Sequence, residues 1–250
     1  MITQLKIGFS KNAVLNYNMS SLMQGIIMEN VSPEFAEKEH ISEIRSYSQY
    51  LTKRDGAWQW VINALTDEAK ENIIDRISET KKFYIKNKDM YLSAENTEIK
   101  TTSFDELFEG NYYLDEKQPR YVRMNFITPA AFKSSGAYIN YPTVKLLLAS
   151  MINKYNALSD VTELGGSDLA EKLAENVDIS NYNLRSTVFH LERVKIPAFL
   201  GNVTLRVNGS KNMISTVNML AEFAQYSGIG IKSAIGMGAV LKNNERRERT

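Results

Sequence analysis

Residues 199–243 read FLGNVTLRVNGSKNMISTVNMLAEFAQYSGIGIKSAIGMGAVLKN. The stretch opens with a β-rich segment that ends at the turn-forming pair Asn208-Gly209. A helix follows and stops at Gly228, and the stretch closes with a short strand, GAVLKN. Strand, helix and strand in this order form the second half of a β-α-β-β-α-β unit, the ferredoxin-like arrangement.

The first half of that unit lies directly upstream. YVRMNFIT, after Gln118-Pro119-Arg120, predicts a strand, and Pro142 opens a helix whose apolar residues recur at helical spacing. A second short helix is predicted over Ser167–Asn176. NYNLRSTVFHLERV then predicts a strand that pairs with FLGNVTLRV as a long hairpin, which completes one unit.

The first 119 residues show the same order of elements. QLKIGF alternates like a strand, and helices are predicted over about Met19–Glu29 and after the helix-starting pair Ser32-Pro33. Two alternating segments flank Asp55-Gly56, a further helix follows, and KKFYIKNKDMYLSA predicts a hairpin. We therefore expect an α+β protein with two tandem ferredoxin-like domains, residues 1–119 and 120–250.

The composition excludes several protein classes. Hydrophobic residues make up 43% of the chain and charged residues 24%, which is typical of a globular protein. No apolar run approaches the roughly 20 residues of a membrane span. With no cysteine there is neither a disulfide framework nor a thiolate metal site. The N-terminus lacks the plan of a signal peptide, so we expect a cytoplasmic protein.

The charge is distributed unevenly along the chain. Residues 1–119 carry 14 Lys/Arg against 19 Asp/Glu, whereas residues 181–250 carry 10 against 4. An excess of cations is what attraction to a phosphate backbone requires. A solvated basic face together with the tail KNNERRERT explains the same numbers, so the charge alone leaves both interpretations open.

Four glycines surround a cation near the end of the chain. They form two Gly-x-Gly pairs, Gly228/Gly230 and Gly236/Gly238, on either side of Lys232 and Ser233. Neither the dinucleotide fingerprint nor the nucleotide phosphate loop fits, which argues against a small-molecule nucleotide enzyme. A helix end with a tight turn explains part of the pattern. The remaining glycines favour a concave site in which exposed N–H groups bind phosphate.

The pattern GIGIKSAIGMG (228–238) resembles the glycine-rich signature of the CRISPR-repeat-processing endoribonucleases of the RAMP superfamily. FITPAAF (126–132), FLGNVTLRV (199–207) and the stretch MQGIIMENVSPEFAEKEHISEIRSYSQYL (23–51) resemble the same family. The resemblance spans nearly the whole chain and is more specific in the C-terminal half. It implies a tandem ferredoxin-like fold that binds CRISPR repeat RNA and cuts it once per repeat. The resemblance further implies that no metal or cofactor is needed and that the products carry a 2′,3′-cyclic phosphate and a 5′-hydroxyl.

The resemblance also points to individual catalytic residues. His40 falls where the family histidine lies, and a helix end with Glu37, Glu39 and Glu43 nearby favours its charged form, which suits a general acid. Arg45 matches the region of a catalytic cation that stabilises the phosphorane, with Lys53 and Arg54 as rivals. Many relatives carry a tyrosine on the first helix. Met28 stands there in this chain, so either Tyr47 takes that role or the role is absent.

RNA contacts are predicted in the C-terminal half. They involve the glycine-rich loop and the cations Arg185, Arg193 and Lys195 of the β-rich hairpin, which would lie against the shape and phosphates of an RNA stem. Arg185 and Arg193 have the same parity and would share a face of a regular strand. His190, among apolar neighbours, is expected to pack in the core or the hairpin. A solvated strand face remains an alternative for the cations.

Two interpretations of the whole chain therefore stay open. The first is a metal-independent endoribonuclease, monomeric or homodimeric, that meets the CRISPR transcript and other effector subunits. The second is a RAMP protein that binds guide RNA in an effector complex without cutting it. The replacement of the family tyrosine by Met28, and Glu39 before the histidine where relatives have an apolar residue, keep the second interpretation open.

Overall fold

The computed structural model describes residues 1–113, 118–161, 163–165, 168–191 and 194–243. In the N-terminal half the elements are β1 (Ile2–Phe9), η1 (Tyr17–Met19), α1 (Ser20–Asn30), α2 (Pro33–Ile41), β2 (Tyr47–Arg54), β3 (Ala57–Ala64), α3 (Asp67–Ala69), the π-helical turn η2 (Lys70–Ile74), α4 (Asp75–Ile77), β4 (Lys82–Ile85), η3 (Lys86–Lys88), β5 (Met90–Thr102) and α5 (Phe104–Tyr112). The five strands form an antiparallel sheet in the order β2-β3-β1-β5-β4.

The C-terminal half contains β6 (Tyr121–Ala130), β7 (Phe132–Ser134), β8 (Ala137–Ile139), α6 (Val144–Leu158), α7 (Leu169–Ala174), β9 (Val177–His190), β10 (Lys195–Val207), α8 (Lys211–Ser227), η4 (Ser233–Ile235) and β11 (Val240–Asn243). Its main sheet has the order β11-β6-β10-β9. In each main sheet the first and last strands of the unit are neighbours: β1 lies beside β5, and β6 lies beside β11. A β-α-β-β-α-β chain requires this arrangement. The predicted α+β, tandem ferredoxin-like fold is confirmed.

Local sequence signals explain where the helices begin. Ser32 caps α2, with its Oγ accepting the Phe35 N–H at 3.3 Å, and Pro33 occupies the first turn. Thr66 caps α3 in the same way through the Ala69 N–H. The hairpin between β2 and β3 turns at Asp55 and Gly56, both with positive φ. None of the described helices is both long and apolar enough to cross a membrane.

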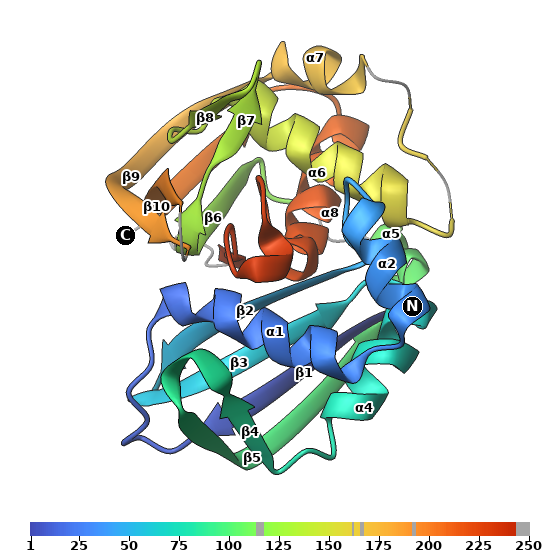
Figure 1. Cartoon of the computed structure of the whole chain (residues 1–250). Coiled ribbons are helices and arrows are strands. Elements are labelled where there is room, and N and C mark those ends of the chain that lie inside the picture. The colour runs from blue at the N-terminus through green and yellow to red at the C-terminus, as the bar shows by residue number, and fades with distance from the viewer. Residues whose placement is uncertain (114–117, 162, 166–167, 192–193, 244–250) are drawn as a thin grey trace.

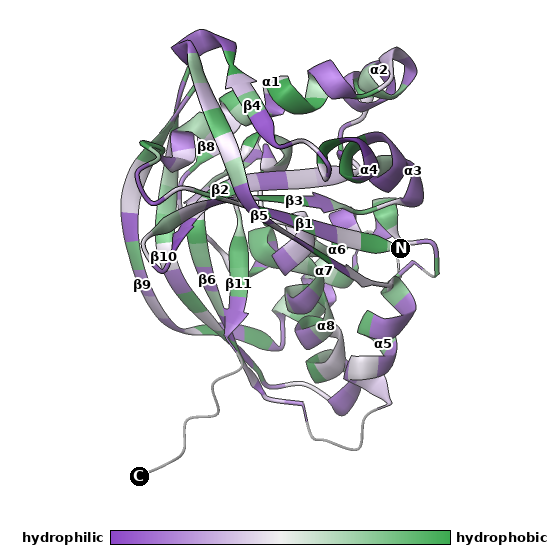
Figure 2. Ribbon diagram, turned by 90° about the horizontal axis from the view of Figure 1, so that it is seen from below, coloured by the Kyte–Doolittle hydropathy of each residue, from purple (hydrophilic) through white to green (hydrophobic). Residues whose placement is uncertain are grey.

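Two apolar cores hold the halves together, because each core contains residues from both halves of the chain. The core of the second sheet includes Ile2, Leu65 and Phe104 from the first half, and α5 packs against α8 (Figures 1 and 2). The core of the first sheet includes Ala234 from the glycine-rich loop. The halves are therefore packed as one body, and the division between residues 119 and 120 stays a prediction.

Candidate active site

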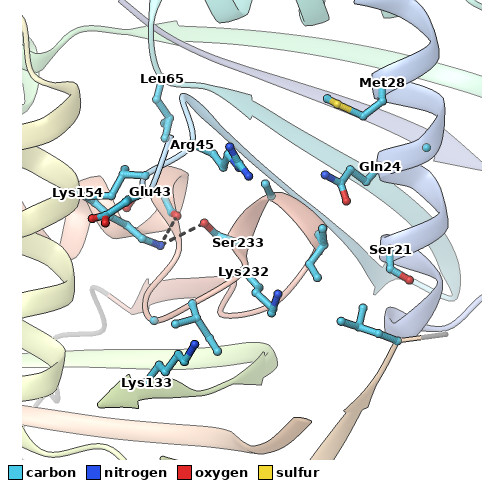
Figure 3. A pocket seen from close by; sticks show the side chains of 18 of the residues that line it. Ser21, Gln24, Met28, Glu43, Arg45, Leu65, Lys133, Lys154, Lys232 and Ser233 are labelled. Carbon is cyan, nitrogen blue, oxygen red and sulfur yellow. Dashed lines mark hydrogen bonds between the residues drawn. The ribbon is translucent and has the colours of Figure 1, made fainter. Parts of the chain in front are cut away.

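A groove of about 1340 Å³ lies between the two halves of the molecule. The first half lines it with α1, residues 43–45 and the β4–η3 edge, and the second half with β7, α6 and residues 230–235. Figure 3 shows Lys133 and Lys232 on the side of the second half, and Arg45 and Gln24 on the side of the first. Side chains that are 187 residues apart in sequence, Arg45 and Lys232, thus line one opening.

The groove carries cations without matching acids. Lys86 pairs with Glu29 at 2.7 Å, which leaves Glu43 as the other acidic side chain in the lining. Within the described part of the chain, no carboxylate oxygen lies within 4.0 Å of the cationic groups of Arg45, Lys133 or Lys232. An anionic ligand would find three unpaired positive charges here.

Among the described residues, one terminal nitrogen of the Arg45 guanidinium has a hydrogen-bond partner and the other has none. Its Nη2 donates to the main-chain oxygen of His40 at 3.0 Å. Its Nη1 is shielded from solvent and meets no hydrogen-bond acceptor among the described residues. A buried guanidinium nitrogen without an acceptor is costly. Because it is shielded from solvent, a ligand in the groove would reach it only after the Arg45 side chain moved. The rival cations Lys53 and Arg54 are exposed at the β2–β3 turn and do not line the groove.

His40 lies in the last turn of α2 and is exposed. Its side chain does not line the groove, but its carbonyl is bound by Arg45, which does. The segment that follows is held firmly, because the buried Glu39 accepts hydrogen bonds from Ser46 N at 3.1 Å and from Ser46 Oγ at 2.6 Å. The Glu39 carboxylate is therefore used to hold this turn. The histidine is next to the cationic groove on a fixed piece of backbone.

Tyr47 is not placed to transfer a proton. Its side chain is 1% exposed and belongs to the core of the first sheet. Burial raises the pKa of Tyr47 to about 12, against an ordinary value of 10.0, so the phenol stays protonated. Its hydroxyl accepts a hydrogen bond from Gln24 Nε2 at 3.4 Å. The prediction of a catalytic Tyr47 is corrected accordingly: the residue packs beneath Gln24, which is the side chain that reaches the groove.

The amides of the four glycines in the loop are used inside the protein. The Gly228 N–H donates to the Ala224 carbonyl, Gly230 to Ser150 Oγ, Gly236 to the Ser233 carbonyl and Gly238 to the Pro129 carbonyl. None of these four N–H groups is available for a phosphate in this structure. The predicted amide cradle is thus not the arrangement that these glycines form.

Close packing explains the glycines instead. A Cβ at Gly230 would lie 2.3 Å from the Ala131 carbonyl oxygen, and one at Gly238 would lie 2.0 Å from that of Ile229. A Cβ at Gly236 would lie 2.2 Å from Ser20 Cβ, in the first half of the molecule. All three have positive φ, which suits glycine. These glycines let the loop fold on itself and dock against the other half.

The docking is completed by side chains of β2. Gln49 Nε2 donates to the Ala234 carbonyl at 3.1 Å and to the Ser20 carbonyl at 2.7 Å. Ser48 Oγ donates to the Tyr226 carbonyl at the end of α8. The loop is therefore the joint between the two halves, and it leaves Lys232 exposed with Ser233 half-buried beside it. Of the loop residues predicted to bind RNA, Lys232 and Ser233 have side chains that line the groove.

The β9–β10 hairpin presents its cations on different faces. Arg185 is exposed opposite Leu200, and Lys195 is exposed opposite His190. Because 185 and 190 differ by an odd number, Arg185 and Lys195 lie on opposite faces of the ribbon. Arg193 lies outside the described residues. His190 is exposed rather than packed in the core, and its main-chain N–H donates to Asn18 Oδ1.

The groove residues that the sequence reasoning missed include Gln24, Lys133 and Lys154. Lys154 left a signal, because it follows Leu147 and Met151 at helical spacing on the apolar face of its helix. A lysine on that face requires partners. Gln24 and Lys133 left none, since a polar residue on a helix or strand edge is normally solvated. In the described ranges, no three Asp, Glu or His side chains gather as a metal site would require.

Comparison with known proteins identifies the family. A family model described as CRISPR-associated endoribonuclease Cas6 matches residues 124–240. A CRISPR-associated endoribonuclease Cas6 of Streptococcus thermophilus is 31% identical over 224 residues, covering 90% of this chain and 90% of that protein. One of Mycobacterium tuberculosis is 29% identical over 223 residues, covering 87% of this chain and 69% of that protein.

Solved structures share the fold. A Cas6 product complex superposes with a TM-score of 0.79 at 20% identity, over 97% of this chain and 99% of that chain. Thermus thermophilus Cas6 gives a TM-score of 0.72 at 21% identity, over 97% of this chain and 98% of that chain. With the streptococcal protein matching over nine tenths of both chains, the conclusion follows that this chain belongs to the family of CRISPR-associated Cas6 endoribonucleases.

Proposed function

We propose that this protein cuts CRISPR precursor transcripts within each repeat and thereby releases guide RNAs. Family membership supports RNA cleavage, and the unpaired cations Arg45, Lys133 and Lys232 support a ribose-phosphate chain as the ligand of the groove. The observation that carries the proposal is the set of three cations without a carboxylate partner among the described residues, Arg45, Lys133 and Lys232, which line one groove.

The proposed chemistry is an internal transesterification that uses no metal. The 2′-hydroxyl of the nucleotide before the cut attacks the phosphorus, and the bond from phosphorus to the 5′-oxygen breaks. The hydroxyl proton passes to water, and the leaving 5′-oxygen takes a proton from the His40 imidazolium. The products are a 2′,3′-cyclic phosphate and a 5′-hydroxyl. The Arg45 guanidinium would donate to the phosphorane oxygens, where negative charge grows in the transition state.

Substrate positioning falls to the second half of the molecule. Lys133 and Lys232 would bind phosphates on either side of the scissile one as point charges. Because Arg185 and Lys195 lie on opposite faces of the ribbon, one of the two would extend the contact along a stem. We further propose that the protein acts as a monomer or homodimer and passes its product to other effector subunits.

Cleavage should persist in EDTA. Incubated with its repeat RNA and a chelator, the protein is expected to give one cut per repeat, with a cyclic phosphate that acid converts to a monophosphate. Replacing the ribose at the cut site by 2′-deoxyribose should abolish the cut, because the nucleophile is gone, while binding stays the same. Mass spectrometry of the fragments reads out the ends. A cut that needs a divalent ion, or that survives the deoxy substitution, contradicts the chemistry.

The rival function is guide-RNA binding without cleavage. It is favoured by the exposed position of the His40 side chain outside the groove lining. Under that interpretation the all-ribose repeat stays intact although it is bound with the same affinity as the deoxy form.

A further inference from the structure

Helix α6 supports the glycine-rich loop with a buried ammonium group. Lys154 Nζ donates to the carbonyl oxygens of Ser227 and Gly228, both at 3.0 Å, and to Ser233 Oγ at 3.2 Å (Figure 3). Its three donors are therefore all used. One turn earlier on the same face, Ser150 Oγ accepts the Gly230 N–H at 2.8 Å.

Burying the Lys154 ammonium to make these contacts costs free energy. Its side chain is 9% exposed, and no carboxylate among the described residues lies within 4.0 Å of Nζ. Burial alone lowers the pKa of Lys154 to about 7, from an ordinary value of 10.5. A buried cation without an ion pair is tolerated where oriented carbonyls replace its water. The Ser227 carbonyl closes the negative end of α8, which adds to that stabilisation.

The contacts span the segment that carries Lys232. Two of them fix the end of α8, and the third fixes the residue directly after Lys232. Lys232 itself has φ +60, a conformation that a lysine rarely adopts without support from its neighbours. Nζ thus ties both sides of the exposed turn to α6.

We propose that Lys154 is a positioning residue for RNA binding: it fixes the turn from beneath so that the Lys232 ammonium faces the groove. The proposal rests on the proposed function, since it takes RNA as the ligand. Lys154 acts through Lys232 and touches no substrate itself. The other charged side chains of the groove are Glu29, Glu43, Arg45, Lys86 and Lys133, and they are unchanged in the variants described next.

The burial of the ammonium has a consequence for stability that can be measured alone. Between pH 7 and pH 10.5 the unfolded chain binds the Lys154 proton and the folded chain does not, so the free energy of unfolding should rise with pH across this window. Lys154→Met should lack this rise. Lys145→Met, an exposed lysine of the same helix that pairs with Glu171, is the control and should keep it. Urea denaturation at several pH values gives the slopes, and equal slopes for all three proteins would mean that the ammonium is not buried.

The positioning role is tested by a double-mutant cycle on RNA affinity. The probe is repeat RNA with 2′-deoxyribose at the cut site, titrated at several salt concentrations. Lys232→Met should reduce the slope of log affinity against log salt by about 0.7, the loss of one phosphate contact. Lys154→Met should reduce it by the same amount although its own ammonium is buried. The double variant should bind no more weakly than Lys232→Met alone, because the two changes remove one contact.

Each other outcome overturns the inference in a distinguishable way. If Lys232→Met changes neither affinity nor slope, the groove is not the RNA site and the proposed function fails with the inference. If Lys232→Met weakens binding but Lys154→Met does not, or if the two effects add, only the positioning role fails. Should Lys154→Met not fold, Lys154→Gln, whose amide can still donate to the Ser227 carbonyl, replaces it in the same cycle.

Discussion

Replacing His40 by alanine is expected to slow cleavage by a factor of about 10²–10⁴, the usual contribution of a general acid or base. The side chain is exposed, so its removal leaves no cavity, and the Arg45 contact is to the His40 carbonyl, which alanine retains. The affinity for repeat RNA should therefore stay close to that of the unaltered protein. Single-turnover cleavage and filter binding measure the two quantities separately.

The chain offers a matched control in His190, the other histidine of the sequence and likewise exposed. His190→Ala should cut at the original rate. Full activity of His40→Ala would assign the proton transfer to another group. Equal loss in both variants would point to a general effect of removing a surface imidazole.

Replacing Gly238 by alanine is expected to destabilise the protein by about 3 kcal/mol or more, the sum of a positive-φ penalty and overpacking. The new Cβ would lie 2.0 Å from the Ile229 carbonyl oxygen, and φ is +71. The clash is between the new Cβ and a main-chain oxygen, so no change of side-chain rotamer can relieve it. Because the same loop joins the two halves, RNA cleavage should be lost together with stability. Urea denaturation measures the change.

Gly110→Ala is the control for this prediction. Gly110 lies inside α5 and has nothing within 4 Å of an added Cβ, so alanine should be neutral or stabilise the helix by up to about 1 kcal/mol. If Gly238→Ala unfolded at the same urea concentration as Gly110→Ala, the loop would have to be far looser than its hydrogen bonds indicate.

Much of the fold was predictable because its signals are local. Ser32 and Thr66 start helices through their own side chains, and Asp55-Gly56 supplies the positive φ values that its hairpin needs. The π-helical turn over Lys70–Ile74 and the packing of α5 on α8 were not predictable. They depend on which surfaces meet after folding, and no sequence period encodes that.

The site was predictable only in part, for the same reason. Lys232 and Arg45 were chosen by residue type and resemblance, and the structure brings both to one groove. Tyr47 was predicted to replace the tyrosine that the first helix lacks, but its position in β2 directs its side chain into the core. The glycines signalled close approach correctly, while what approaches them is the Ala131 carbonyl and Ser20, not a phosphate. A glycine in a sequence indicates that another group comes close to the backbone, but it does not identify that group.

The insertion of residues 230–236 against Ser20 and Gln49 has a consequence for chimeric proteins. A hybrid that takes its N-terminal half from one relative and its C-terminal half from another will inherit mismatched partners at this contact. Exchanging the loop together with α1 and β2, rather than at the midpoint of the chain, keeps together the two surfaces that contact each other. Such an exchange leaves the joint between the two halves intact.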